Sequence, residues 1–259
     1  MTDRAGLLEQ GELVVEGRLV AASNTTLLCR IAGPDGDAHC VYKPAAGERP
    51  LWDFPDGTLA AREYAAYLVS EAAGWQLVPP TVLRDGPYGP GMCQLWVDES
   101  GAELVDIVPR DSVRDGWLAV LDAVDGDGKP VTLVHADDPR LRRLALFDIV
   151  INNADRKAGH ILADSRGTVL GVDHGVSFHA EDKLRTVLWG WAGTQLTDEE
   201  LDLLLHLRAE TEGTLGFQLA DLLAAEELRA MRERISRLVR HGRLPAMEYR
   251  RRPIPWPVF

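Results

Sequence analysis

The chain has 259 residues, of which 46% are hydrophobic, so it can bury a sizeable core as one large domain or as two lobes. Its formal net charge of −12 argues against general affinity for nucleic acid. No apolar run reaches the roughly eighteen residues that a membrane span needs, so no transmembrane segment is expected.

The beginning of the chain, MTDRAGLLEQGEL, lacks the basic and apolar regions of a signal peptide, and none is expected. The cysteines Cys29, Cys40 and Cys93 are odd in number, lie far apart and lack the spacing of metal ligands. Reduced thiols and a cytoplasmic location are therefore expected.

Alternation of apolar and polar residues over 12–20, followed by the apolar run 27–31, predicts two strands. Their connection contains Ser23, Asn24 and Thr25, whose hydroxyl, amide and backbone N–H groups can bind phosphate oxygens. A plain polar hairpin loop is an equally good interpretation of these residues alone.

A third strand is predicted over 39–43; it ends in Lys43, because Pro44 follows. A helix is predicted over 58–74, with Thr58 as its cap. Glu63 lies in the second turn of this helix, and Glu71 lies near its end, where the helix dipole disfavours a carboxylate.

Two further strands are predicted over 78–83 and 92–97, joined by the turn-rich sequence RDGPYGPG. The composition then changes from strand-like to helix-like, so a boundary is predicted near residue 100. The apolar pattern over 117–124 predicts a helix, and Asp138-Pro139 predicts the start of another.

Residues 144–178 carry the most informative pattern of the chain. An apolar helix leads into Asn152-Asn153-Ala154-Asp155-Arg156, His160 follows, and a predicted strand pair ends at Asp173-His174-Gly175. Asp-Arg after a helix is often only an ion pair, and Asp-X-Gly is often only a turn. Their combination, with strands between them, favours a site with two carboxylates.

This D-R-x-x-x-polar-I-L…V-D-x-G pattern resembles the phosphatidylinositol 3-/4-kinases and the related HipA-type and actin-fragmin-type atypical kinases, including a bacterial family described as phosphatidylinositol 3-/4-kinase-like. The resemblance covers the whole chain in element order, and its specific motifs are limited to about thirty residues around the site. It implies an α+β, two-lobed protein-kinase-like fold, with a β-rich N-lobe with one main helix over 1–100 and a helical C-lobe over 101–259.

Under this resemblance the chain is an ATP-dependent phosphotransferase that uses Mg²⁺ or Mn²⁺. Asp155 is then the base that orients and deprotonates an acceptor hydroxyl, and Lys157 stabilises charge on the transferred phosphoryl group. Asp173 binds the metal that bridges the phosphates. Arg156 has a structural role.

The resemblance also assigns nucleotide-binding residues in the first hundred positions. Lys43 binds the α- and β-phosphates and Glu63 pairs with it. The loop containing Ser23, Asn24 and Thr25 covers the phosphates, although it lacks the glycines of protein kinases. Backbone groups of the hinge strand meet the adenine edge; these hinge residues are Leu95, Trp96 and Val97.

His160 departs from the family pattern, which has a second metal-binding asparagine at this position. A neutral imidazole can ligate Mn²⁺ better than Mg²⁺, and Asn152 or Asn153 can supply an oxygen instead. The departure keeps open the alternative of a nucleotide-binding pseudokinase with a regulatory or scaffolding role. A relative that binds ATP in reverse would need more cations than Lys43, Arg156 and Lys157 provide.

The acceptor is expected to be a protein or a small soluble molecule, because the body of the chain is acidic whereas a lipid head group favours a basic or apolar rim. A membrane lipid stays an alternative. From Glu226 to the end there are nine arginines and four glutamates, and the helix predicted over 226–239 has a basic face. A solvated face is the expected interpretation of these arginines.

Overall fold

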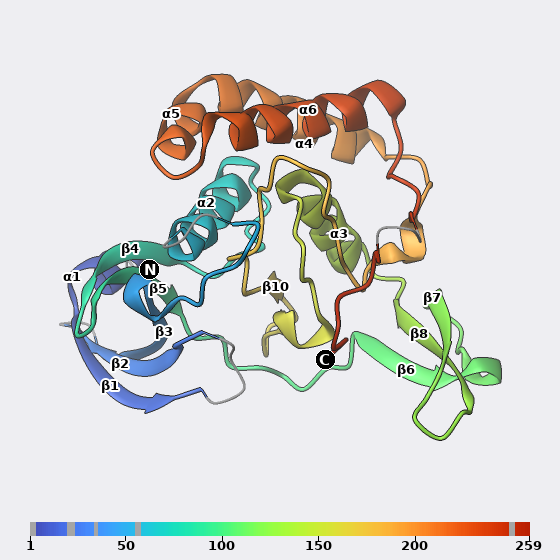
Figure 1. Cartoon of the computed structure of the whole chain (residues 1–259), viewed down its shortest axis with the longest axis horizontal. Coiled ribbons are helices and arrows are strands. Elements are labelled where there is room, and N and C mark those ends of the chain that lie inside the picture. The colour runs from blue at the N-terminus through green and yellow to red at the C-terminus, as the bar shows by residue number, and fades with distance from the viewer. Residues whose placement is uncertain (1–3, 20–23, 34–35, 55–57, 249–251) are drawn as a thin grey trace.

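The computed structural model describes residues 4–19, 24–33, 36–54, 58–248 and 252–259. The N-terminal part is built on a five-stranded antiparallel sheet in the order β1-β2-β3-β5-β4, with α1 and α2 packed against it (Figure 1). Its elements are α1 (Arg4–Gln10), β1 (Glu12–Arg18), β2 (Leu27–Ala32), β3 (Ala38–Pro44), α2 (Leu59–Ala72), β4 (Thr81–Gly86) and β5 (Gly89–Leu95).

The side chains of β2 alternate between buried and half-buried, as expected for a sheet with one covered face. Cys29 and Cys40 lie opposite each other on β2 and β3, and both are fully buried with Cys93 in the same core. The hydrogen bond with Cys29 lowers the pKa of Cys40, but the hydrogen bond with Cys93 and burial outweigh this effect and raise the pKa to about 12. The three cysteines, distant in sequence, are therefore free, buried core residues that lie together.

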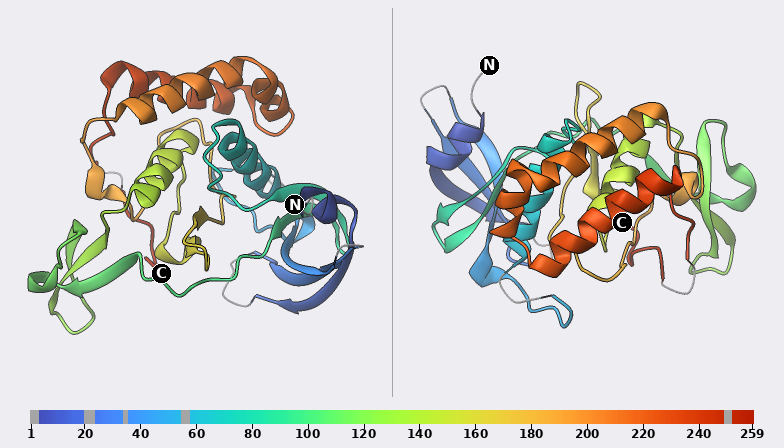
Figure 2. Two further views of the ribbon diagram at one scale, coloured as in Figure 1. Left: turned by 180° about the vertical axis from the view of Figure 1, so that it is seen from behind. Right: turned by 90° about the horizontal axis from the view of Figure 1, so that it is seen from above.

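A second sheet of three antiparallel strands, in the order β6-β8-β7, lies at the opposite end of the molecule from the first sheet (Figures 1 and 2). Its strands are β6 (Val105–Pro109), β7 (Trp117–Val124) and β8 (Pro130–Ala136). The helix predicted over 117–124 is wrong, because this segment is β7. Its leucines and alanines pair with the β-branched run of β8, so tertiary pairing overrides local helix propensity.

The remaining chain is mainly helical, and α4, α5 and α6 form a layer above α2 and α3 in Figure 1. The elements are α3 (Pro139–Ile151), β9 (Ile161–Ala163), β10 (Val169–Gly171), α4 (Asp198–Glu212), α5 (Thr214–Ala220) and α6 (Ala225–His241). Short 3₁₀ helices occur at Ala45–Gly47, Arg110–Ser112, Ala158–His160 and Trp189–Trp191.

The helix starts follow sequence signals. Asp138 caps α3 by accepting a hydrogen bond from the Arg140 N–H, and Thr197 forms a capping box with Glu200 at α4. Thr58 does not cap α2 with its side chain. Instead the Glu48 carboxylate accepts the N–H groups of Leu59 (3.1 Å) and Ala60 (2.8 Å).

The fold is therefore α+β, with a β-rich N-terminal part and a mainly helical C-terminal part, as predicted. The three-stranded sheet was not predicted. The division near residue 100 stays a prediction. Among the described residues, no helix has both the length and the apolar character needed to cross a membrane.

Candidate functional site

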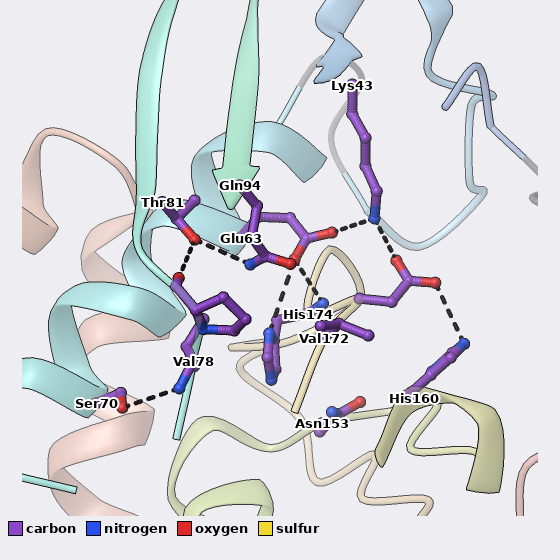
Figure 3. Close-up of polar contacts among 12 residues, drawn as sticks. Lys43, Glu63, Ser70, Val78, Thr81, Gln94, Asn153, His160, Val172 and His174 are labelled. Atoms are coloured by element: carbon purple, nitrogen blue, oxygen red, sulfur yellow. Dashed lines mark hydrogen bonds and ion pairs between the residues drawn. The ribbon is translucent and has the colours of Figure 1, made fainter. Parts of the chain in front are cut away.

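Lys43 is the centre of a three-residue contact (Figure 3). Its Nζ donates to Glu63 Oε1 at 2.6 Å and to Asp173 Oδ1 at 2.8 Å. Pairing of β3 with β2 and β5 fixes the backbone around it, and Lys43 lies opposite Met92 on β5. Burial alone lowers the pKa of Lys43, but the charges of Asp173 and Glu63 outweigh this effect and raise it. Lys43 is therefore a firmly protonated cation.

Glu63 is almost completely buried on α2. Its Oε2 accepts the backbone N–H of His174 at 2.7 Å, so both carboxylate oxygens are bonded. Burial raises the pKa of Glu63, but the charge of Lys43 reverses this and leaves a net decrease. Glu63 is thus an ionised carboxylate that connects α2, β3 and the turn after β10.

The preceding residue, Arg62, fixes the position of α2. Its guanidinium donates to Glu227 Oε1 of α6 and to the Ser177 carbonyl, both at 2.7 Å. The Arg62 and Glu227 side chains are 2% and 8% exposed, so this is a buried ion pair. These contacts connect the helix that carries Glu63 to the C-terminal part of the chain.

Asp173 lies in the turn after β10 and has a φ of 59°. Aspartate is among the few non-glycine residues that adopt this left-handed conformation with some frequency. Its side chain is half exposed. The positive charge of Lys43 is the main reason that the pKa of Asp173 lies well below its ordinary value.

The loop that carries Asp155 is held by Arg156, which is completely buried and pairs with Asp148 of α3 at 2.9 Å. The same guanidinium donates to the carbonyls of His160 (3.1 Å) and Val172 (2.8 Å). Arg156 therefore fixes the Asp155 loop relative to the turn containing Asp173. This structural role agrees with the interpretation of Arg156 from the sequence.

Asn152 and Asn153 both have their amide oxygens engaged by backbone N–H groups. Asn152 Oδ1 accepts from Lys183 N and Asn153 Oδ1 accepts from Asp155 N, each at 2.9 Å. Both side chains are buried. The suggestion that one of them supplies a metal-binding oxygen is not supported.

Asp155 itself is partly exposed and pairs with Lys157, with 3.1 Å between Nζ and Oδ2. Burial raises the pKa of Asp155, Lys157 opposes the increase, and the nearby charge of Asp173 adds to it. The net result is a raised pKa. A carboxylate with a raised pKa is a stronger proton acceptor, which suits a general base.

His160 bridges the two aspartates. Its Nδ1 lies 3.0 Å from the Asp155 carbonyl and its Nε2 lies 3.4 Å from Asp173 Oδ2. Burial lowers the pKa of His160 despite the opposing charge of Asp173, so the neutral ring is favoured. A carbonyl only accepts, so Nδ1 carries the proton and Nε2 presents a lone pair towards the carboxylate.

Two acceptors that face each other in this way fit a shared cation. Asp173 and His160 are therefore placed so that both can contact one divalent metal, and their role as metal ligands stays a prediction. No group of three or more His, Cys, Asp or Glu with the geometry of a metal site occurs among the described residues. Further ligands would then have to come from the nucleotide and from water.

The loop predicted to cover the phosphates is described only in part. Ser23 lies outside the described residues. Asn24 Oδ1 accepts the Arg49 N–H at 2.9 Å, and Thr25 N donates to the Gly47 carbonyl at 3.1 Å. The end of the loop is therefore fixed to the segment after β3.

At the predicted hinge, β5 ends at Leu95 rather than at Val97. The Leu95 N–H donates to Pro80 O and the Trp96 N–H donates to His39 O, each at 2.9 Å. These two N–H groups already donate within the N-terminal part. An adenine at this segment would have to contact other backbone groups of the predicted hinge. The role of Leu95, Trp96 and Val97 stays a prediction.

His174 was not identified from the sequence, where it occupies the variable position of Asp-X-Gly. It is completely buried, and its Nε2 accepts from Arg156 Nη2 at 2.7 Å. Its Nδ1 lies 3.7 Å from Glu63 Oε2, beyond hydrogen-bond distance. Burial and the positive charge of Arg156 lower the pKa of His174.

No protein-family model matches the chain. Among solved structures, the chain is similar to a proinflammatory kinase of Helicobacter pylori, CtkA, with a TM-score of 0.45 and 11% identity. That match covers 91% of this chain and 94% of the other. The likeness is too distant to carry an argument about function.

A close relative is found among curated proteins. The chain is 51% identical to Protein Rv2133c of Mycobacterium tuberculosis over an alignment of 267 residues, which covers 99% of this chain and 96% of that protein. The chain therefore belongs to the same protein family as Protein Rv2133c.

Proposed function

We propose that this chain is an ATP-dependent phosphotransferase of the atypical-kinase type, which transfers the γ-phosphoryl group to a hydroxyl. The observation that carries the proposal is the contact of Lys43 with both Glu63 and Asp173. These residues come from a strand end, a helix and a turn that are up to 130 positions apart. Phosphoryl transfer needs a cation for the phosphates and a carboxylate for the metal side by side.

Each residue of the site has a role in this proposal. Lys43 Nζ binds phosphate oxygens, and the buried Glu63 holds the ammonium group in place. Asp173 and His160 hold the divalent metal, which neutralises developing charge on the phosphates when it is bound. Asp155 accepts the proton of the acceptor hydroxyl. Lys157, which pairs with Asp155, stabilises charge on the phosphoryl group.

The acceptor is proposed to be a protein or a small soluble molecule. The chain as a whole carries a net charge of −12, which disfavours approach to an anionic membrane surface. A lipid acceptor is the alternative. Transfer to phosphatidylinositol in vesicles whose other lipids are neutral would identify it.

The test combines nucleotide binding with transfer of labelled γ-phosphate. ATP with Mg²⁺ or Mn²⁺ should stabilise the protein, by about 2.7 kcal/mol at a hundred times the dissociation constant. Asp173→Asn should remove the metal-dependent part of this stabilisation while the protein stays folded. Lys43→Ala should weaken ATP binding. Lys129→Ala is its matched control, because Lys129 lies in the turn between β7 and β8 and its side chain is 73% exposed.

The absence of any nucleotide-induced stabilisation with either metal would contradict the proposal. A non-nucleotide binding module or a structural protein would then be the better interpretation.

A second candidate function is that of a nucleotide-binding pseudokinase. His160 favours it, because an imidazole occupies the position of the expected metal-binding asparagine. The active kinase is preferred because both Asp155 and Asp173 are retained and accessible. Nucleotide binding without turnover, across a broad acceptor screen with both metals, would support the pseudokinase instead.

A further inference from the structure

A pocket of about 350 Å³ lies between α3, α6 and the C-terminal segment, which here means residues 243–248 and Pro253. It is separate from the site around Lys43. None of Lys43, Glu63, Asp155, His160 and Asp173 lines it. Its wall is mostly apolar, and representative members are Ile149, Leu184, Trp189, Leu238, Leu244 and Pro253. Volume and lining are both in the range of small-molecule sites.

The polar part of the lining is predominantly basic. Arg234, Arg237 and Arg243 line the pocket together with His241, and the opposing acidic residues are Asp182 and Glu248. Arg237 lies 3.3 Å from Asp182, so one acidic charge is shared with one arginine. The charge of the lining is therefore positive on balance.

Arg234 is the residue that indicates a ligand. It is 4% exposed; its Nε donates to Val150 O at 3.1 Å and its Nη1 donates weakly to His179 O at 3.4 Å. Its Nη2 has no hydrogen-bond partner among the described residues. The nearby carboxylate of Glu227 is committed to Arg62.

A buried guanidinium with an unsatisfied donor is energetically costly. Burial lowers the pKa of Arg234 to about 10, which still leaves the group protonated at neutral pH. The pocket is thus lined by a desolvated positive charge that is incompletely hydrogen-bonded and lies next to an apolar wall. An anionic group bound beside Arg234 would compensate this charge.

We propose that this pocket is a second ligand site, which binds a small molecule with an apolar body and one carboxylate or phosphate group. The anionic group contacts Arg234, and the apolar body packs against α3, α6 and Trp189. The proposal is independent of the function of the Lys43 site.

The proposal is tested by isothermal titration calorimetry on the full chain with four probes. Naphthalene-2-carboxylate and 2-naphthyl phosphate carry the anion on an apolar body, 2-naphthalenemethanol is the neutral isostere, and inorganic phosphate is the anion alone. At least one of the two naphthyl anions should bind at least tenfold more tightly than 2-naphthalenemethanol and inorganic phosphate. The tighter of the two anions identifies the preferred head group.

Two variants locate the site. Arg234→Gln should weaken binding of the naphthyl anion at least tenfold, a difference of about 1.4 kcal/mol. Ala246→Trp fills the pocket from an exposed position, so it should abolish binding even if Arg234→Gln fails to fold. Arg240→Gln is the matched control on α6, because Arg240 is exposed and does not line the pocket.

Equal binding of the anionic and neutral naphthyl probes would contradict the proposal, and so would no binding of any probe. Unchanged affinity in a folded Arg234→Gln or Ala246→Trp protein would also overturn it.

Discussion

The buried ion pair between Arg62 and Glu227 is expected to hold α2, and with it Glu63, in position. The perturbation is a double-mutant cycle with Arg62→Met, Glu227→Leu and the combined variant. Arg62→Met leaves the Glu227 carboxylate, 8% exposed, without its partner. Glu227→Leu leaves the Arg62 guanidinium, 2% exposed, with the Ser177 carbonyl and Thr58 Oγ1 as its acceptors among the described residues.

Each single substitution should lower the free energy of unfolding by about 3–5 kcal/mol, because it leaves an uncompensated buried charge. The double variant replaces the pair with apolar side chains, a change that is often neutral or stabilising. It also loses the hydrogen bond from the Ala224 N–H to Glu227, which caps α6 and contributes about 1 kcal/mol. The double variant should therefore lie within about 2 kcal/mol of the wild type.

The assay is urea unfolding followed by circular dichroism, which gives the free energy of unfolding of each variant. The control is the same cycle on Arg143 and Glu199, which are 3.1 Å apart but 42% and 72% exposed, and whose coupling should be at most about 1 kcal/mol. A coupling between Arg62 and Glu227 as small as that of the control would refute the reasoning, because the pair would then be solvated.

Three other predictions concern single side chains. The pKa of Glu63 is lower in the folded state than its ordinary value of 4.5, so the stabilisation by ionised Glu63 is complete above that pH and is lost as the pH falls through the folded value. Glu63→Gln should therefore flatten the acid limb of the pH profile of thermal stability, and an unchanged limb would contradict this. Asp155→Asn should abolish transfer but preserve ATP binding, and undiminished transfer in the variant would show that the base is misassigned. Because the pKa of Asp155 is raised above 3.8, the acid limb of the kcat/KM profile of the wild type should lie above that pH. His160→Asn should shift the metal preference of transfer from Mn²⁺ towards Mg²⁺, and identical Mn²⁺-to-Mg²⁺ rate ratios in variant and wild type would argue against His160 as a ligand.

The contact of Lys43 with Glu63, and their closeness to Asp173, could be predicted because the resemblance to atypical kinases assigns these three residues to one site. Lys43 ends a predicted strand before a proline, Glu63 lies within a predicted helix, and Asp173 follows a predicted β-branched strand. Element order then restricts which of these segments can meet. The structure contains both contacts.

The contacts that fix this arrangement could not be predicted in the same way. Arg62 and Glu227 are 165 positions apart, and each looks like a surface residue of a helix. Glu48 caps α2 from a proline-rich loop, which gives no capping pattern in the sequence. His174 carries no signal, because its role depends on the buried guanidinium of Arg156.

The wrong prediction over 117–124 has a related cause. Leucine and alanine favour a helix locally, whereas the strand is stabilised by pairing with β8. The pocket around Arg234 could not be predicted from the sequence either, because its walls come from α3, α6 and the C-terminal segment, which are far apart in the chain. The arginines of α6 were interpreted as a solvated face, but Arg234 is buried.

The most direct test of the central claim is chemical labelling with an acyl-phosphate derivative of ATP, which acylates lysines next to bound phosphates. The chain has four lysines, namely Lys43, Lys129, Lys157 and Lys183, so peptide mass spectrometry can assign every site of labelling. The account predicts that Lys43 is labelled, that excess ATP with Mn²⁺ prevents this labelling, and that the exposed Lys129 shows no such protection. Labelling of Lys43 that ATP does not reduce, or that is no greater than labelling of Lys129, would contradict it.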